Sequence, residues 1–159
     1  MTNTNTSALQ KVLSLWSGLS SALDRLQPAL ALAARIYVGK AFFLSGLTKI
    51  RDWDTTLALF ADEYKVPLLP PALAAVMGTT GELVLPVLLV LGLGGRFAAL
   101  GLSVVNVVAV ISLADIAPAA LQQHIFWGSL LAALAVFGPR EWSLDHLIAG
   151  KIGYPSQKN

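Results

Sequence analysis

Hydrophobic residues are concentrated in four long runs along the chain, a pattern that indicates membrane-spanning helices. The runs occupy residues 28–50, 72–94, 95–115 and 119–138, and each is close to the roughly 20 residues that a helix needs to cross a bilayer. Gly92, Gly94 and Gly95 leave only a tight turn between the second and third runs, so these two should form an antiparallel hairpin. The sequence therefore predicts an all-α fold, an integral membrane four-helix bundle.

Shorter amphipathic stretches flank these runs and predict short interfacial helices. Before the first run, apolar residues recur at three- and four-residue steps: Leu9, Val12, Leu13, Trp16, Leu19, Leu23 and Leu26. Pro28 suits the first turn of a helix, so the first span should start there. A second stripe lies within residues 53–64, and Ser143 can cap a third short helix. We therefore expect an N-terminal segment of residues 1–27, a four-span domain of residues 28–138 and a tail of residues 139–159.

The composition agrees with a membrane protein and excludes several function classes. Hydrophobic residues make up 55% of the chain and charged residues only 13%, which is too apolar for an ordinary soluble domain. The chain contains no cysteine, so any thiol chemistry must belong to a partner. No basic run interleaved with aromatic residues indicates a nucleic-acid partner.

The basic residues predict how the chain is oriented in the bilayer. With four spans both termini share one side, which holds six cations: Lys11, Arg25, Arg96, Arg140, Lys151 and Lys158. The opposite loops hold three, Lys49, Arg51 and Lys65, together with five carboxylates. Because cytoplasmic loops carry the excess of Lys and Arg, both termini should be cytoplasmic. In a bacterium this would be a multi-pass protein of the inner membrane.

Three polar residues fall near the middle of the predicted spans. Counting about 1.5 Å per residue from the cytoplasmic ends puts Lys40, Glu82 and Asn106 roughly 16 to 18 Å deep. An unpaired charge there costs about 2.5 to 3.5 kcal/mol on insertion scales, so Glu82 should face the bundle interior and pair with a cation. Depth favours Lys40 as that cation. The helix face and the two-pronged guanidinium favour Arg35, which we prefer, with Lys40 in the same network or extended toward the membrane surface.

Pro86 adds to the polar character around Glu82. A proline four residues after Glu82 cannot donate a hydrogen bond to its carbonyl, so the helix should kink there. Thr79 and Thr80 add hydroxyl groups one turn earlier. This patch predicts either a small-molecule or proton site, or a buried ion pair that only fixes the helix register.

His124 defines a second candidate site near the outer end of the fourth run, where Trp127 follows one turn later. The imidazole either accepts protons or contacts a quinone, or it is merely a hydrated polar group. One histidine within the membrane cannot supply two axial ligands to a haem, and no metal site is indicated. The candidate cofactor-binding residues are Arg35, Lys40, Thr79, Glu82, Asn106, His124 and Trp127, with quinone as the candidate cofactor and no catalytic residue assigned.

An ordered set of residues resembles a known family. Arg35, Gly39, Gly46, Lys49, Pro67, Glu82, Gly92 and Arg96 occur in the order and spacing of the DoxX family of small four-span bacterial membrane proteins. The resemblance covers roughly residues 30 to 148. The stretches SGLTKIRDWDTTLALFADEY, VPLLPP, LQQHIFW and SLDHLI look closer to members encoded beside enzymes that modify small metal-binding peptides.

The resemblance implies a membrane subunit linked to redox or oxidative-stress chemistry. Relatives belong to a thiosulfate–quinone oxidoreductase or assemble with detoxifying enzymes, so other membrane or soluble redox proteins, or further copies of the chain, are the expected partners. In an enzyme, this chain would be at most a non-catalytic or quinone-interacting subunit. Two alternatives stay open: an accessory to a permease or exporter of a small solute, metal complex or metal-binding peptide, and a scaffold that recruits soluble enzymes.

Overall fold

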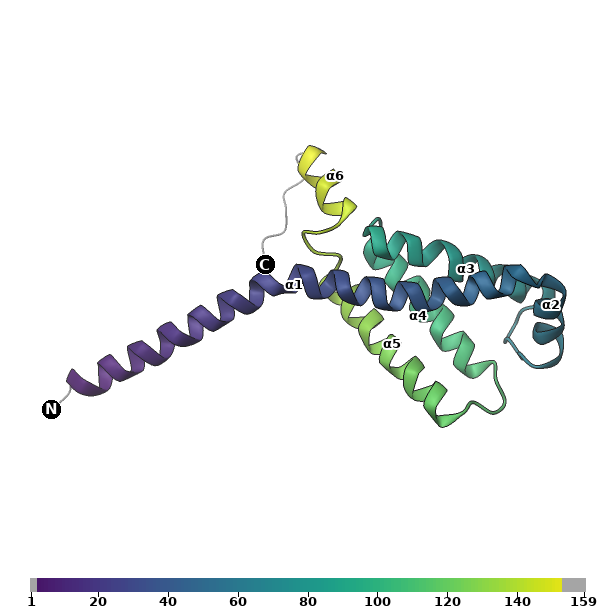
Figure 1. The fold of residues 1–159 in the computed structure, drawn as a ribbon, viewed down its shortest axis with the longest axis horizontal. Helices are drawn as coiled ribbons and strands as arrows, with labels where there is room; N and C mark the ends of the chain where they lie inside the picture. The colour runs from purple at the N-terminus through teal and green to yellow at the C-terminus, as the bar shows by residue number, and fades with distance from the viewer. Residues whose placement is uncertain (1–2, 153–159) are drawn as a thin grey trace.

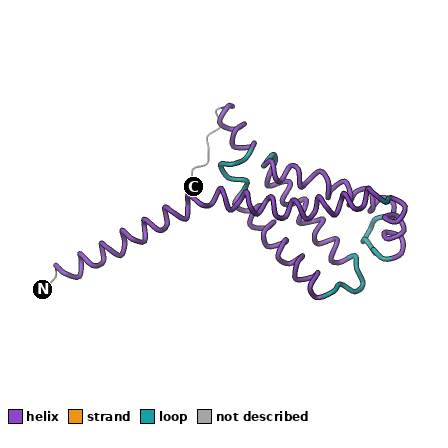
Figure 2. The backbone as a smooth tube through the Cα atoms, in the orientation of Figure 1, coloured by secondary structure: helices purple, strands orange, loops and turns teal. Residues whose placement is uncertain are grey.

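A computed structural model describes the backbone of residues 3–152 and the side chains of residues 9–151, and the regular elements of that part are all helices (Figure 1, Figure 2). They are α1 (Asn3–Arg51), α2 (Trp53–Asp62), α3 (Pro71–Leu91), α4 (Gly95–Ile111), α5 (Pro118–Phe137) and α6 (Leu144–Ile152). The prediction of an all-α membrane bundle is confirmed. The remaining residues, which include Lys158, one of the six cations counted on the predicted cytoplasmic side, lie outside the described part.

Four helices form the membrane bundle: the C-terminal half of α1, α3, α4 and α5 (Figure 1). Among the described residues, α1, α3 and α5 are long and apolar enough to cross a membrane. The fourth, α4, has 17 residues and ends at Ile111, earlier than the predicted residue 115. At 1.5 Å per residue it is about 25 Å long, a few ångströms less than the usual hydrocarbon thickness.

The predicted helix start at Pro28 is wrong. Pro28 lies inside α1, which runs from Asn3 to Arg51 as one helix of 49 residues, and its N-terminal half extends away from the bundle (Figure 1). A proline inside a helix removes one hydrogen bond, here to the carbonyl of Asp24. Asp24 is exposed, so water can satisfy that carbonyl, and the Leu and Ala residues on both sides favour helix. The segment of residues 9–26 is therefore continuous with the first span and does not form a separate helix.

The predicted short helix between the first two spans is confirmed as α2. Asp52 caps its N-terminus by accepting hydrogen bonds from the Thr55 hydroxyl at 2.7 Å and the Thr55 amide at 3.0 Å, and these bonds lower the pKa of the Asp52 carboxyl. Phe60 is buried against Ala74 and Ala75 of α3. Burial of this aromatic ring fixes α2 over one end of the bundle.

Close packing of α1 against α3 forms the centre of the bundle. A Cβ atom added to Gly46 would lie 2.9 Å from Leu83 Cγ, and one added to Gly39 would lie 2.7 Å from Val90 Cγ2. Only glycine lets the two backbones approach so closely. The main core cluster then fills the space between α1, α3, α4 and α5: Val38, Phe42, Leu89, Ala98, Ala99, Leu102, Leu131 and Leu134.

The α3–α4 turn holds the C-terminal tail. Gly92 ends α3 with φ +65°, a conformation that glycine adopts without strain. Asp145 accepts hydrogen bonds from the amides of Gly94 and Gly95 at 2.8 and 3.0 Å. Ser143 caps α6 by accepting from the amide of His146 at 3.2 Å, as its sequence position predicts. These contacts attach α6 to the end of the bundle opposite α2.

Candidate functional site

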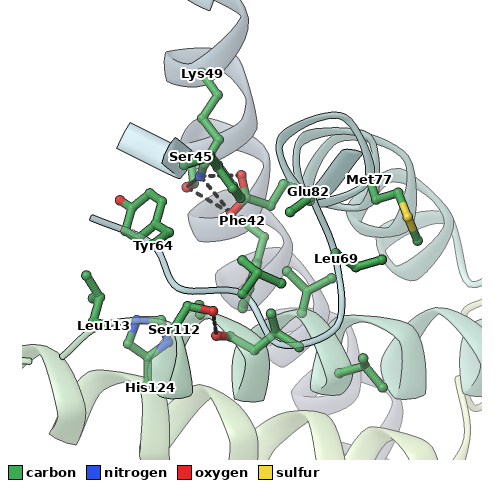
Figure 3. Close-up of a pocket in the computed structure, with 18 of the residues that line it drawn as sticks. Phe42, Ser45, Lys49, Tyr64, Leu69, Met77, Glu82, Ser112, Leu113 and His124 are labelled. Carbon is green, nitrogen blue, oxygen red and sulfur yellow. Dashed lines mark hydrogen bonds and ion pairs between the residues drawn. The ribbon is translucent and has the colours of Figure 1, made fainter. Parts of the chain in front are cut away.

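Glu82 on α3 forms an ion pair with Lys49, in the last turn of α1 (Figure 3). The Lys49 Nζ atom lies 2.6 Å from Glu82 Oε2 and 2.9 Å from Oε1. Ser45, one turn before Lys49, donates to Glu82 Oε1 at 3.2 Å and accepts from Lys49 Nζ at 2.9 Å. The two charged side chains are only 10% and 18% exposed, so their charges are compensated within the protein.

The predicted pairing of Glu82 with Arg35 or Lys40 is wrong because α1 and α3 are offset. Gly46 lies opposite Glu82, since a Cβ atom at residue 46 would be 3.1 Å from Glu82 Cβ. Eleven residues separate Arg35 from Gly46, about 16 Å along the helix, which is beyond the reach of the side chain. The depth estimate assumed that the first span begins at residue 28, but α1 has no boundary there.

Arg35 and Lys40 have other surroundings. Arg35 is completely buried, and its guanidinium donates to the carbonyls of Ala31 and Val90 at 3.4 Å and to the carbonyl of Trp142. It therefore joins the end of α3 to the segment before α6. Lys40 is exposed and borders a shallow apolar groove between α1 and α3 that also contains Pro86. Neither cation contributes to the Glu82 network.

A cavity of about 420 Å³ adjoins the Lys49–Glu82 pair (Figure 3). Side chains from all five helices α1–α5 and from the loop after α2 line it. Most of the lining is apolar, and the polar side chains that line it belong to Ser45, Lys49, Tyr64, Glu82, Ser112, His124 and Trp127. A mainly apolar pocket of this size with a few polar groups is typical of a small-molecule site.

His124 is held in the cavity wall by Asn106. The Asn106 Nδ2 donates to the backbone carbonyl of His124 at 3.0 Å, which directs the amide oxygen toward the ring, where Oδ1 lies 2.8 Å from His124 Nδ1. Because an amide oxygen only accepts, Nδ1 carries the proton. The other ring nitrogen, Nε2, has no hydrogen-bond partner among the described residues and is left as an acceptor.

Trp127 contributes a buried donor to the same wall. Its ring packs edge-on against His124, with centroids 5.1 Å apart, and against Phe42 at 5.6 Å. The indole Nε1 is buried and has no acceptor among the described residues. Leaving such a group unsatisfied costs roughly 1 to 3 kcal/mol, so a turn of the ring that brings Nε1 to an acceptor in the cavity would be favoured.

Tyr64, which follows α2, is a cavity residue that the sequence pattern did not reveal. Burial raises the pKa of the Tyr64 phenol, and the negative charges of Glu63 and Glu82 raise the pKa further. The phenol therefore stays neutral and can donate a hydrogen bond. Ser45 was also missed, and Lys49 was named only through the family resemblance and not as a site residue, although the two share a helix face one turn apart.

The predicted site residues are only partly brought together. Glu82, His124 and Trp127 line the cavity, and Asn106 orients His124 from behind. Thr79 is buried with an unsatisfied hydroxyl but does not line the cavity. In the described part of the chain, no group of three or more His, Asp or Glu residues is arranged to hold a metal ion.

Comparison with known proteins identifies the family. The family model described as DoxX matches residues 30–115, more than half of the 159-residue chain, and this range contains Lys49 and Glu82. The stretches LQQHIFW and SLDHLI lie beyond it, so the narrower resemblance to members encoded beside peptide-modifying enzymes stays a prediction. No curated protein and no solved structure matched the chain. On the family match, this chain is a member of the DoxX family.

Proposed function

We propose that this DoxX-family protein is a membrane subunit that binds the headgroup of a quinone in the cavity lined by helices α1 to α5. The observation that carries the proposal is the wall formed by Trp127 and His124. It pairs a buried indole N–H that lacks an acceptor with an imidazole nitrogen that is available to accept. A quinone and its reduced form need both kinds of group, because the quinone carbonyl accepts a hydrogen bond and the hydroquinone hydroxyl donates one.

The rest of the cavity suits a planar, largely apolar ring. Phe42 and Phe60 supply aromatic surface, and Tyr64 and Lys49 supply further donors for a second carbonyl. The cavity volume of about 420 Å³ is within the range of small-molecule sites, and much of its wall belongs to membrane-spanning helices, which would give a lipid-soluble ligand access. This combination favours a quinone over a charged or strongly hydrated solute.

The proposed role of the cavity in redox chemistry rests on the protons that a quinone takes up or releases. Reduction of a quinone to the hydroquinone takes up two electrons and two protons, and oxidation releases them. When a hydroquinone is oxidised in this proposal, His124 Nε2 accepts one of the two protons and water entering the cavity takes the other, while Asn106 keeps the ring oriented through Nδ1. The electrons pass to or from a partner redox protein, which makes the chain a quinone-binding subunit in this proposal.

Quinone binding by the purified protein tests the proposal. A short-chain quinone is titrated into the protein in mild detergent and followed by calorimetry, and lipid extracts are assayed for bound quinone. Trp127→Phe keeps the ring but removes the N–H, so we expect binding to weaken roughly threefold to tenfold, the effect of one hydrogen bond. The matched control, Trp16→Phe, changes an exposed indole outside the bundle and should bind as the unmodified protein does.

The two alternative functions give different results in the same preparations. A permease accessory would allow solute flux in proteoliposomes, and a scaffold would co-purify with soluble enzymes while its cavity stays empty. Absence of quinone binding, or equal binding by Trp127→Phe and the unmodified protein, would remove the present proposal.

A further inference from the structure

The N-terminal half of α1 carries an apolar stripe with a strict heptad spacing. Successive members are separated alternately by three and four residues: Leu9, Val12, Trp16, Leu19, Leu23, Leu26 and Leu30. With Leu9 as position a, the first six residues occupy every a and d position of three heptads, and Leu30 takes the next a position. An ordinary amphipathic surface helix follows a period of 3.6 residues, whereas this alternation has the 3.5-residue period of a coiled coil.

Within the described part of the chain, no other segment packs against the stripe. Its seven side chains are 52% to 64% exposed although all are large and apolar. This half of α1 extends away from the other helices (Figure 1). Contiguous apolar surface of this kind is characteristic of a contact with another molecule.

The position of the stripe argues against its lying on the bilayer surface. Arg35 bonds to the carbonyl of Val90 and so marks the end of the bundle. Leu30 lies about 8 Å beyond Arg35 along the helix and Leu9 about 39 Å beyond it. The headgroup layer is only about 5 to 8 Å thick on each side. To lie on the membrane, the helix would have to fold across the end of the bundle at its exit, but α1 stays helical through Pro28 and its N-terminal half slants away from the bundle (Figure 1).

The charge pattern fits a second copy of the same chain. The charged residues of this segment, Lys11, Asp24 and Arg25, occupy positions b and c, away from the seam. Positions e and g carry only Leu, Ser, Ala and Gln between residues 13 and 29, so two identical helices meet without like-charge contacts. Copies in one membrane share an orientation, which makes their N-terminal halves parallel and brings a against a and d against d.

We propose that two copies of this protein associate through a parallel coiled coil of residues 9–30, outside the membrane and independently of any ligand in the cavity. Three heptads alone are a marginal coiled coil in water, because helix nucleation is unfavourable. Here the membrane-embedded half of α1 continues directly into the segment and preforms the helix. Confinement of both copies to one bilayer also raises their effective concentration.

Disulfide cross-linking in native membranes tests the interface, and the absence of native cysteine makes every cross-link specific. Leu19→Cys and Leu23→Cys place a thiol at positions d and a. Ser14→Cys and Ser21→Cys place one at position f, on the opposite face, and serve as matched controls. After mild oxidation we expect at least tenfold more disulfide-linked dimer from residues 19 and 23 than from residues 14 and 21.

Three results would overturn the proposal. One is equal cross-linking on both faces, or none on either. Another is a cross-linked product whose mass is not twice that of one chain, which would mean that the partner is a different protein. The last is quenching of probes at residues 19 and 23 by lipid-borne quenchers, which would place the stripe on the bilayer. Leu19→Glu gives a second measurement: light scattering should show half the mass of the unmodified protein, with helical content unchanged by circular dichroism.

Discussion

At the scale of single residues, the charge on Glu82 is explained by its partner. Lys49 contributes an ammonium group from the last turn of α1, and Ser45 bonds to both members of the pair. Taking a carboxylate out of water is unfavourable unless such contacts replace its hydration. Because the pair also lines the cavity, the same interaction that stabilises the α1–α3 contact places two charged groups beside a bound molecule.

A double-mutant cycle measures this pair. Replacing Glu82 with Gln leaves the Lys49 ammonium without its counter-charge, and we expect a loss of about 3 kcal/mol in the free energy of unfolding in detergent. The double change Glu82→Gln with Lys49→Met should cost clearly less than the sum of the single changes. The cycle of Glu82→Gln with Arg35→Gln is the control and should be additive, since Arg35 contacts only carbonyls. Additivity in the Lys49 cycle would contradict the pairing.

At the scale of helices, the α1–α3 contact decides where the polar groups meet. Gly46 lies directly against Leu83 and Glu82, and this register brings Ser45 and Lys49 to the carboxylate. Pro86 does not interrupt α3, and its buried ring instead packs close to Gly39. The contact between the two helices therefore depends on small residues on one side and a rigid ring on the other.

Adding one methyl group at this contact should separate the helices. In Gly46→Ala the new Cβ would lie 2.9 Å from Leu83 Cγ and 3.1 Å from Glu82 Cβ, so we expect a loss of about 1 to 3 kcal/mol, as for other overpacked cores. Gly18→Ala is the matched control, because nothing lies within 4 Å of that position. There the better helix propensity of alanine should leave stability equal or raise it by up to about 1 kcal/mol. Thermal unfolding in detergent compares the two, and equal effects would show that the close approach at residue 46 is unimportant.

At the scale of the whole molecule, the two ends of the bundle differ in chemistry. One end carries the extended half of α1, the α3–α4 turn and α6, and holds most of the basic residues outside the spans. The other end carries α2 and the loops rich in carboxylates. The excess of positive charge predicts that the end with α6 faces the cytoplasm.

Cysteine labelling tests this orientation. Single changes Gln10→Cys and Asp62→Cys introduce thiols at exposed positions at opposite ends of the molecule. In spheroplasts, an impermeant thiol reagent should modify residue 62 and leave residue 10 unmodified, and both should react once the membrane is made permeable. Labelling of residue 10 but not residue 62 in sealed spheroplasts would reverse the predicted orientation.

The sequence by itself determined the elements of the fold. Membrane-spanning helices, the short helix after Arg51 and the cap at Ser143 follow from local properties: the length of apolar runs, turn residues and capping side chains. The family was also readable, since the resemblance drawn from Lys49, Glu82 and their neighbours agrees with the DoxX match over residues 30–115. The false boundary at Pro28 arose because a proline suits a helix start but is also tolerated inside a helix where water can reach the carbonyl that loses its hydrogen bond, here that of the exposed Asp24.

Only the tertiary structure decided which polar residues meet. Counting depth along isolated spans led to Arg35 or Lys40 as the partner of Glu82, whereas packing at Gly46 shifts α1 so that Lys49 reaches the carboxylate. In the same way, the hydrogen bonds between Asn106 and His124 depend on how α4 crosses α5. Helix type is set by neighbours in sequence, but the offset between two helices is set by which side chains fit together, and that information is spread over residues far apart in the chain.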